Sequence, residues 1–193
     1  MRKKSTTIII ITVSSILVLI TLAFVFLCGS LVFGLFIPVK EISYDIDDWQ
    51  LLQETHSYLP AISEMGNYET LKCKHQSREN LVISSDAYIL SATYSKSEFD
   101  IQKEHIEGTY LFQVKVEDEI GESIVSKDAS FFVDGFDFKM LSLEEYDLYY
   151  PKYFVLVGFS EEDNMVCFVF FEDMELDYIR GSFEDFLKDE CGW

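Results

Sequence analysis

A run of 35 residues without Asp, Glu, Lys, Arg or His, from Ser5 to Val39, constrains what this chain can fold into more than any other feature. The hydrocarbon core of a bilayer is about 30 Å thick, and a helix needs about 20 apolar residues to cross it. A secretory signal has a shorter apolar region of about 7 to 15 residues, whereas Ile8–Leu27 already has 20. We therefore predict a transmembrane helix over residues 5–39.

Two kinds of processing at FVFLCGSLVFG, the stretch Phe24–Gly34, are alternatives to a retained span. Cys28 and Ser30 place small side chains where a cut after Ser30 requires them, and cleavage there is the less favoured alternative. Bacterial lipoprotein signals have Gly, Ala or Ser before the modified cysteine, but Leu27 precedes Cys28 here. The sequence thus favours a retained helix in which Cys28 is a small apolar residue in lipid.

The charges on the two sides of the run predict its orientation. A basic tail, residues 1–4, precedes the run, whereas Lys40 on the far side is followed by Glu41 and further carboxylates. Basic residues beside a span stay preferentially in the cytoplasm. We predict a single-pass protein of the cell membrane with a cytoplasmic N-terminus and with residues 40–193 outside.

The composition of residues 40–193 describes an acidic, folded domain. All 34 Asp and Glu residues of the chain lie there with 12 of the 15 Lys and Arg, so the formal net charge of this segment is −22. A field of this sign repels phosphates, which excludes nucleic acid as a partner. The segment also holds 26 of the 30 aromatic residues, too many for a disordered chain, and its length fits one domain.

Three kinds of apolar pattern predict strands. Apolar and polar residues alternate, as in half-buried strands, in Glu69–Gln76, Ala87–Tyr94 and Tyr110–Val116. Two more alternating runs flank Asp134 and Gly135, a pair that tolerates the positive φ angles of a type I′ turn, so a hairpin is predicted there. Lys152–Ser160 and Met165–Glu172 are apolar at nearly every position, which predicts two central strands buried on both faces.

Helices are predicted at three places. Asp47–His56 has apolar residues on one side. A capping-box pattern begins at Ser95 before a helix over Lys96–Glu107, and Gly108 stands where a C-terminal cap belongs. Ser182 is the expected N-cap of a short terminal helix.

The remaining segments complete the predicted fold class. Leu59–Gly66 is expected to be a loop and Glu117–Asp128 a polar connection. Strands in hairpins, with one or two helices packed on one face and one to three packed helices in all, predict an α+β domain with a mainly antiparallel sheet.

Metal-ligand residue types occur in two patterns, and neither fits a metal. Cys73 and His75 lie near each other, but structural zinc uses cysteines two to four residues apart, and no two cysteines of the domain are that close. Four carboxylates faintly resemble a calcium loop: Asp173, Glu175, Asp177 and Glu184. Tyr178 stands at the sixth position, where that loop needs Gly. We expect a solvated strand edge and no bound metal.

The three cysteines of the domain, Cys73, Cys167 and Cys191, allow one disulfide and one thiol in an oxidising compartment. The sequence leaves the pairing open. We expect Cys73 and Cys167, which lie on predicted strands, to be buried and Cys191, near the chain end, to be exposed.

Signatures of catalysis are absent from the sequence. It contains neither G-x-S-x-G nor S-x-x-K, since the tripeptide at residues 158–160 begins the first motif but continues with Glu. It also has no P-loop, dinucleotide fingerprint or HExxH. The three histidines are expected to be surface or packing residues: His56, His75 and His105. We predict no catalytic residue and no cofactor.

Three segments of the C-terminal half carry a resemblance: YYPKYFVLVG, then LDYI, then FLKDECGW. With the membrane-anchored start, they resemble a set of uncharacterised single-span, membrane-anchored proteins of Gram-positive bacteria. The resemblance covers most of the outer domain and implies a bacterial envelope setting, but it implies no activity.

These features together predict a non-catalytic extracytoplasmic module that is held in the membrane by residues 5–39 and binds a protein or envelope ligand. An envelope hydrolase that uses acidic residues is one alternative. A membrane immunity or stress protein is another, and the sequence alone does not separate it from the binding module.

Overall fold

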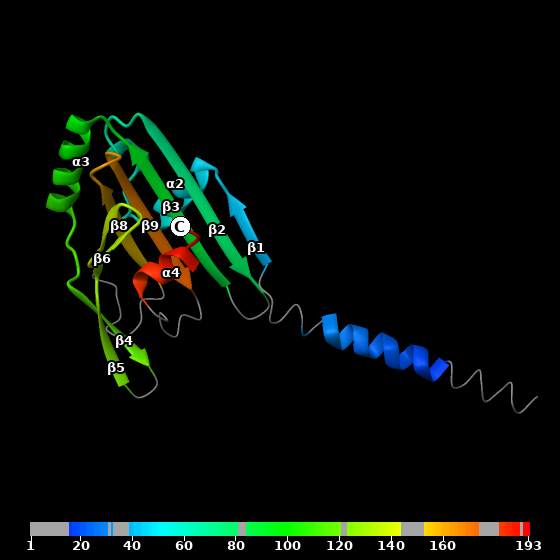
Figure 1. The fold of residues 1–193 in the computed structure, drawn as a ribbon. Helices are drawn as coiled ribbons and strands as arrows, with labels where there is room; N and C mark the ends of the chain where they lie inside the picture. Colours follow the sequence, from blue (N-terminus) through cyan, green and yellow to red (C-terminus); the bar gives the residue numbers. More distant parts are fainter. Residues whose placement is uncertain are drawn as a thin grey trace, which may run out of the picture. The chain divides into compact units, whose positions relative to one another are not determined.

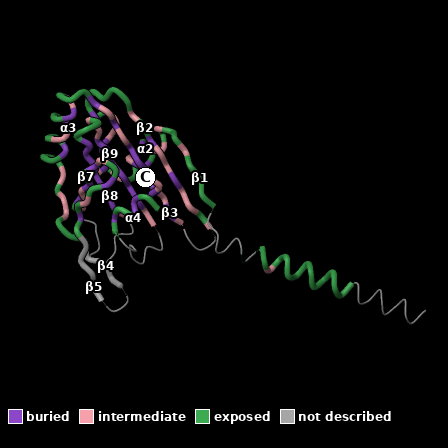
Figure 2. Tube along the Cα trace, in the orientation of Figure 1, coloured by how far each residue is buried: buried purple, intermediate pink, exposed green. Residues whose placement is uncertain are grey.

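The computed structural model describes residues 16–30, 32, 39–80, 84–120, 123–143, 153–173, 182–189 and 191–193. Two compact units make up the chain: Met1–Val39 with Asn80–Val82, and Lys40–Glu79 with Ile83–Trp193. Residues 16–30 form a helix whose side chains are exposed except for the half-buried Cys28 (Figure 2). No helix in the described ranges is long and apolar enough to cross a membrane. Of the rest of the predicted span, Val32 is helical and Val39 begins a strand rather than ending the helix. The other residues of the span, and the tail of residues 1–4, lie outside these ranges.

A seven-stranded antiparallel sheet forms the centre of the second unit (Figure 1). Its order is β1-β2-β3-β9-β8-β7-β6. The strands, in that order, are Val39–Ser43, Thr70–Glu79, Ser84–Thr93, Met165–Asp173, Tyr153–Ser160, Phe136–Met140 and Ser130–Val133. The α+β class with a mainly antiparallel sheet is therefore confirmed. The central position of the apolar strands β8 and β9 is confirmed as well, since β9 has three strands on either side.

Helices cover both faces of the sheet. Helix α2 (Ile46–Thr55), the 3-10 helix η1 (Ile62–Glu64) and helix α3 (Lys96–Thr109) belong to one face, and helix α4 (Phe183–Asp189) belongs to the other. The expectation that the helices pack on one face was wrong. Because β8 and β9 are apolar at almost every position, water must be excluded from both faces of the sheet.

Two phenylalanines of β9 on opposite faces of the sheet show how the two cores are divided. Phe168 packs with Trp49 of α2 and Phe99 of α3 in one core, whereas Phe171 packs with Phe186 of α4 in the other. The rings of Phe171 and Phe186 meet edge to face, with centroids 4.8 Å apart. Alternate side chains of a strand point to opposite faces, so one strand anchors both layers of helices.

The predicted hairpin is confirmed in detail. Strands β6 and β7 pair with Val133 opposite Phe136, which leaves a two-residue turn. Asp134 has φ 48° and Gly135 has φ 87°, the positive values that a type I′ turn needs at both positions.

The chain between α3 and β6 differs from the prediction. The predicted strand Tyr110–Val116 is present only in part, as an isolated bridge from Phe112 to Leu141 and as the first two residues of a later strand, and Glu117–Asp128 is not a connection. Instead β4 (Lys115–Ile120) and β5 (Ser123–Asp128) form a separate two-stranded antiparallel ribbon. The strands of such a ribbon satisfy each other's backbone groups. Glu117–Asp128 has no regular apolar alternation in its sequence, so the sequence did not predict strands there.

The predicted helix boundaries hold at the start of α3 but not at its end. The hydroxyl of Ser95 accepts a hydrogen bond from the Glu98 backbone N–H (3.4 Å), as an N-cap does. Gly108 lies inside the helix, which runs through Thr109. At α4 the hydroxyl of Ser182 accepts from the Asp185 N–H (3.2 Å), so the predicted cap is confirmed.

Candidate functional site

The segment between α2 and β2 is held rigidly over the first face of the sheet. The fully buried indole of Trp49 donates from Nε1 to the carbonyl of Pro60 (3.1 Å). The hydroxyl of Tyr94 on β3 donates to the carbonyl of Met65 (2.8 Å), and burial raises the pKa of this phenol. Two buried side chains thus fix both ends of the segment that carries η1.

Gly66 brings this segment into close contact with α3. Its φ is +67°, and a Cβ there would lie 2.0 Å from Nε2 of Gln102, so only glycine fits. Gln102 is 7% exposed and donates to Oε1 of Glu98 (3.3 Å), which also accepts from the N–H of Asn67 (3.3 Å). Glu98 therefore ties the segment to α3 rather than completing the predicted capping box.

A hollow of about 320 Å³, called the α3 hollow below, lies between η1 and α3. The described residues that line it are Pro60, Glu64, Met65, Gln102, His105, Ile106, Thr109, Tyr110 and Phe168. Its apolar members are buried, whereas Glu64, His105 and Thr109 are exposed. The hollow thus combines an apolar floor with a polar rim, and its volume lies at the lower end of small-ligand sites, roughly 300 to 1,000 Å³.

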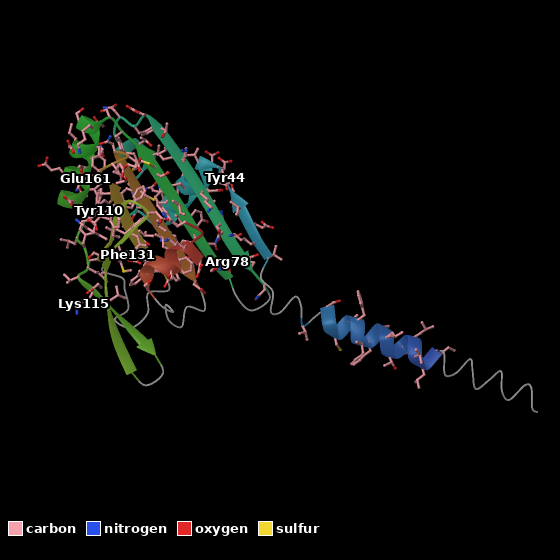
Figure 3. The ribbon with its side chains drawn as sticks, in the orientation of Figure 1. Tyr44, Arg78, Tyr110, Lys115, Phe131 and Glu161 are labelled. Carbon is pink, nitrogen blue, oxygen red and sulfur yellow. The ribbon has the colours of Figure 1, made fainter. Side chains whose placement is uncertain are left out.

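Glu64 and Tyr110 dominate the electrostatics of the hollow. One carboxylate oxygen of Glu64 accepts from the backbone N–H of Ala61 (2.9 Å), which holds the side chain on η1. Burial, and then the nearby charge of Glu64, raises the pKa of Tyr110 to about 12. Tyr110 follows the end of α3 (Figure 3), and its ring meets Phe168 edge to face at 6.2 Å.

A second hollow, of about 570 Å³, lies between α2 and η1. Its described lining residues are Trp49, Gln50, Gln53, Glu54, Ala61, Ile62, Ser63, Gly66 and Tyr68. Most of these side chains are exposed or half-buried. The α3 hollow offers the more buried floor, so we take it as the candidate site.

A second cluster of titratable groups surrounds His75 on β2. Its Nε2 lies 2.7 Å from Oδ1 of Asp86, its Nδ1 lies 3.8 Å from Oδ2 of Asp48, and its ring stacks on Tyr88 at 4.0 Å. The charge of Asp86 adds to burial in raising the pKa of Tyr88 to about 12. Because both ring nitrogens face carboxylates, neither is placed to take a proton from a bound water. The cluster fits a packing role.

His56 also packs among aromatic rings. Its Nδ1 lies 2.9 Å from the hydroxyl of Tyr58, and its ring lies 4.7 Å from that of Phe170. His105 lines the hollow between η1 and α3.

The carboxylates of the faint calcium-loop pattern lie only partly in the described chain. Asp173 ends β9 and Glu184 lies in the first turn of α4, whereas Glu175 and Asp177 lie outside the described residues. Among the residues that the structure describes, no group of three or more His, Cys, Asp or Glu side chains could hold a metal ion.

The structure corrects the expectation that Cys191 is exposed. All four are thiols in the structure, and Cys73 and Cys167 are buried as predicted. Cys191 is fully buried rather than exposed, because the chain end folds back against the sheet. There the Nζ of Lys74 donates to the carbonyl of Gly192, and Trp193 packs edge-on against Phe138 at 5.1 Å.

No protein-family model, no curated protein and no solved structure matches this chain. The candidate site therefore depends on the geometry of its own residues. Sequence reasoning missed Glu64, Gln102 and Tyr110, since the hollow joins segments about 40 and 60 residues apart that share no motif. Pro60 and Gly66, which bound the η1 segment, were its only local signal.

Proposed function

We propose that this protein is a membrane-anchored, extracytoplasmic binding module without catalytic activity, and that the α3 hollow is its ligand site. One observation carries the anchoring: the helix of residues 16–30 exposes large apolar side chains such as Leu19, Phe24 and Phe26, which are 65 to 77% exposed. Exposed apolar surface of this kind is stable in lipid rather than in water. The uncharged run continues from this helix in both directions, from Ser5 to Val39.

The two hydroxyls of this helix also support a place in lipid. Thr21 donates to the carbonyl of Leu17 and Ser30 donates to the carbonyl of Phe26, each at 2.9 Å. Polar groups in hydrocarbon must be satisfied within the protein. Both hydroxyls meet that condition without a partner helix or water.

A role in binding is supported by the rigidity of the segment beside the α3 hollow. Trp49, Tyr94 and Gly66 fix the η1 segment, which lines the hollow. The ligand site is therefore formed before a ligand arrives, which lowers the entropic cost of binding. A hydrolase would show an activity that is lost when one carboxylate is replaced without loss of folding. An immunity or stress protein would show a growth phenotype only under challenge.

Protease shaving of intact bacterial cells that express the full chain tests the anchoring and its orientation. We expect peptides beyond Lys40 to be released and a membrane-retained fragment that mass spectrometry shows to be uncut through residues 24–34. Permeabilised cells provide the control for protease access. Replacing residues 2–4 by Ser should weaken the orientation preference, because basic residues determine it. A domain that stays protected until the membrane is opened would contradict the proposal.

A further inference from the structure

We propose that the α3 hollow takes a small organic cation, of the alkylammonium class, with the ammonium group between Glu64 and the ring of Tyr110. This inference rests on the proposed binding function and specifies the ligand of the same site. It combines three features of the hollow: its charge, its aromatic walls and its fixed size.

The charge of the hollow is negative. Among the described residues that line it, Glu64 carries a formal negative charge and none is Lys or Arg. One oxygen of Glu64 is held by the Ala61 N–H, which fixes the carboxylate in place. The surrounding domain carries a net charge of −22, and a field of that sign concentrates cations near the surface. An anionic ligand would be repelled by Glu64 at short range and by the net charge of the domain at long range.

The aromatic part of the hollow suits an alkylated ammonium rather than a hydrated metal ion. Tyr110 is half-buried, and with Phe168 it makes an aromatic corner at the floor. The face of an aromatic ring attracts a cation that has shed its water, by about 0.5 to 2 kcal/mol. Met65 and Ile106 add apolar wall, which favours methyl or methylene groups on the nitrogen.

The size and rigidity of the hollow limit the ligand to a small molecule. Its volume of about 320 Å³ is too small for a folded partner or a polymer chain to enter. The contact of Gly66 with Gln102 closes one side, while Gln102 and Thr109 supply oxygen atoms that can accept hydrogen bonds from N–H or O–H groups of the ligand.

Isothermal titration of the full chain in non-ionic detergent at pH 8 provides the test. The probes are choline and 3,3-dimethyl-1-butanol (dimethylbutanol below), which has the shape of choline without its charge. Comparing the two affinities separates the effect of charge from that of shape. We expect choline to bind in the millimolar range, as suits a ligand of few atoms, and at least about fivefold more tightly than dimethylbutanol, as one well-placed charge contact predicts.

Matched variants test whether the preference for choline arises in the α3 hollow. Glu64→Gln keeps an oxygen for the Ala61 N–H but removes the charge, so it should weaken choline about fivefold to tenfold and leave dimethylbutanol unchanged. Tyr110→Leu should weaken choline about fivefold, and Tyr110→Phe should retain its affinity because the ring remains. Glu104→Gln, an exposed carboxylate next to His105 that does not line the hollow, should change neither affinity.

The outcomes separate this inference from the function on which it rests. Equal affinities for the two probes, or an unchanged choline affinity in Glu64→Gln, would overturn the cation assignment and leave a site for neutral ligands. If neither probe binds the wild-type chain, the cation assignment is wrong, whereas the membrane-anchored binding module stays a separate proposal. The shaving experiment tests the membrane anchor independently of either result.

Discussion

Gly158 and Gly108 show how much the consequence of one methyl group depends on its surroundings. A Cβ on Gly158, in β8, would lie 2.5 Å from Cε1 of the fully buried Phe138, whereas a Cβ on Gly108, inside α3, would have nothing within 4 Å. Gly158→Ala should therefore destabilise the domain by about 1 to 3 kcal/mol through overpacking. Gly108→Ala should stabilise it by about 0.5 to 1 kcal/mol, because alanine loses less backbone entropy in a helix.

Urea unfolding of the full chain in non-ionic detergent, followed by Trp fluorescence, measures both changes. The two variants serve as controls for each other, since each adds the same methyl group. A Gly158→Ala chain as stable as wild type would show that the ring of Phe138 can move aside. This result would contradict the tight packing of the core around Phe138.

The buried cysteines lead to a second prediction at the residue scale. Burial, with the charge of Asp48 as the next cause, raises the pKa of Cys73 to about 11, and burial also raises the pKa of Cys167. Because only the thiolate is alkylated rapidly, iodoacetamide at pH 8 should leave Cys73, Cys167 and Cys191 unmodified in the native chain. Peptide mass spectrometry should find all three modified after unfolding in urea.

Comparing the native chain with the urea-unfolded chain controls for reagent quality and peptide recovery. Rapid native labelling of Cys191 alone would mean that the chain end detaches from the sheet in solution. Intact disulfide-linked peptides would instead show that an oxidised pair forms, a question that the sequence left open.

At the residue scale, the sequence predicted what depends on near neighbours and missed what depends on distant ones. The cap at Ser95 and the turn at Asp134 were predicted because their partners lie within a few residues. The burial of Cys191 depends on contacts with β2 and β7. The place of Gln102 depends on Gly66, and no local pattern signals such a contact.

The β6–β7 hairpin offers a prediction at the scale of an element. Gly135 has φ 87°, a region that costs other residues about 1 to 2 kcal/mol, so Gly135→Ala should destabilise the domain by about that amount. Asp134→Asn should change stability by less than about 0.5 kcal/mol, because Asn tolerates positive φ. The ion pair that Asp134 would lose, with Lys188 at 3.5 Å, is exposed and worth little.

Thermal unfolding followed by circular dichroism compares the two variants. A larger loss in Asp134→Asn than in Gly135→Ala would contradict the type I′ turn and would give the ion pair with α4 the greater role.

The sequence predicted the elements with a clear apolar pattern and missed the β4–β5 ribbon, whose sequence is mostly polar. The apolar character of β8 and β9 predicted their central position, and with the same information it should have predicted helices on both faces of the sheet. Strands β4 and β5 pair only with each other, so the polar sequence of the ribbon was taken for a connection. Hydrophobic periodicity reports burial rather than pairing.

At the scale of the whole molecule, the net charge of the domain lowers the stability of its fold. Residues 40–193 carry a net charge of −22, and self-repulsion of that size destabilises a compact state. Exposed ion pairs oppose this repulsion locally: a carboxylate oxygen of Glu161 lies 2.6 Å from Nζ of Lys103 and the other lies 3.2 Å from Nζ of Lys96. Hydrogen bonds from these two lysines, that of Lys103 first, lower the pKa of Glu161. Exposed pairs contribute only about 0 to 1 kcal/mol each.

The balance predicts that salt stabilises this protein. Raising ionic strength from about 0.01 M to about 1 M shortens the Debye length from about 30 Å to about 3 Å, which screens the many repulsions more than it weakens the few pairs. The thermal midpoint of the full chain should therefore rise with sodium chloride. Glu161→Gln, which loses the pairs that salt weakens, should show a larger rise than wild type. A midpoint that falls with salt would mean that the local pairs around α3, rather than the net charge, control stability, and the negative field invoked for the α3 hollow would be correspondingly weak.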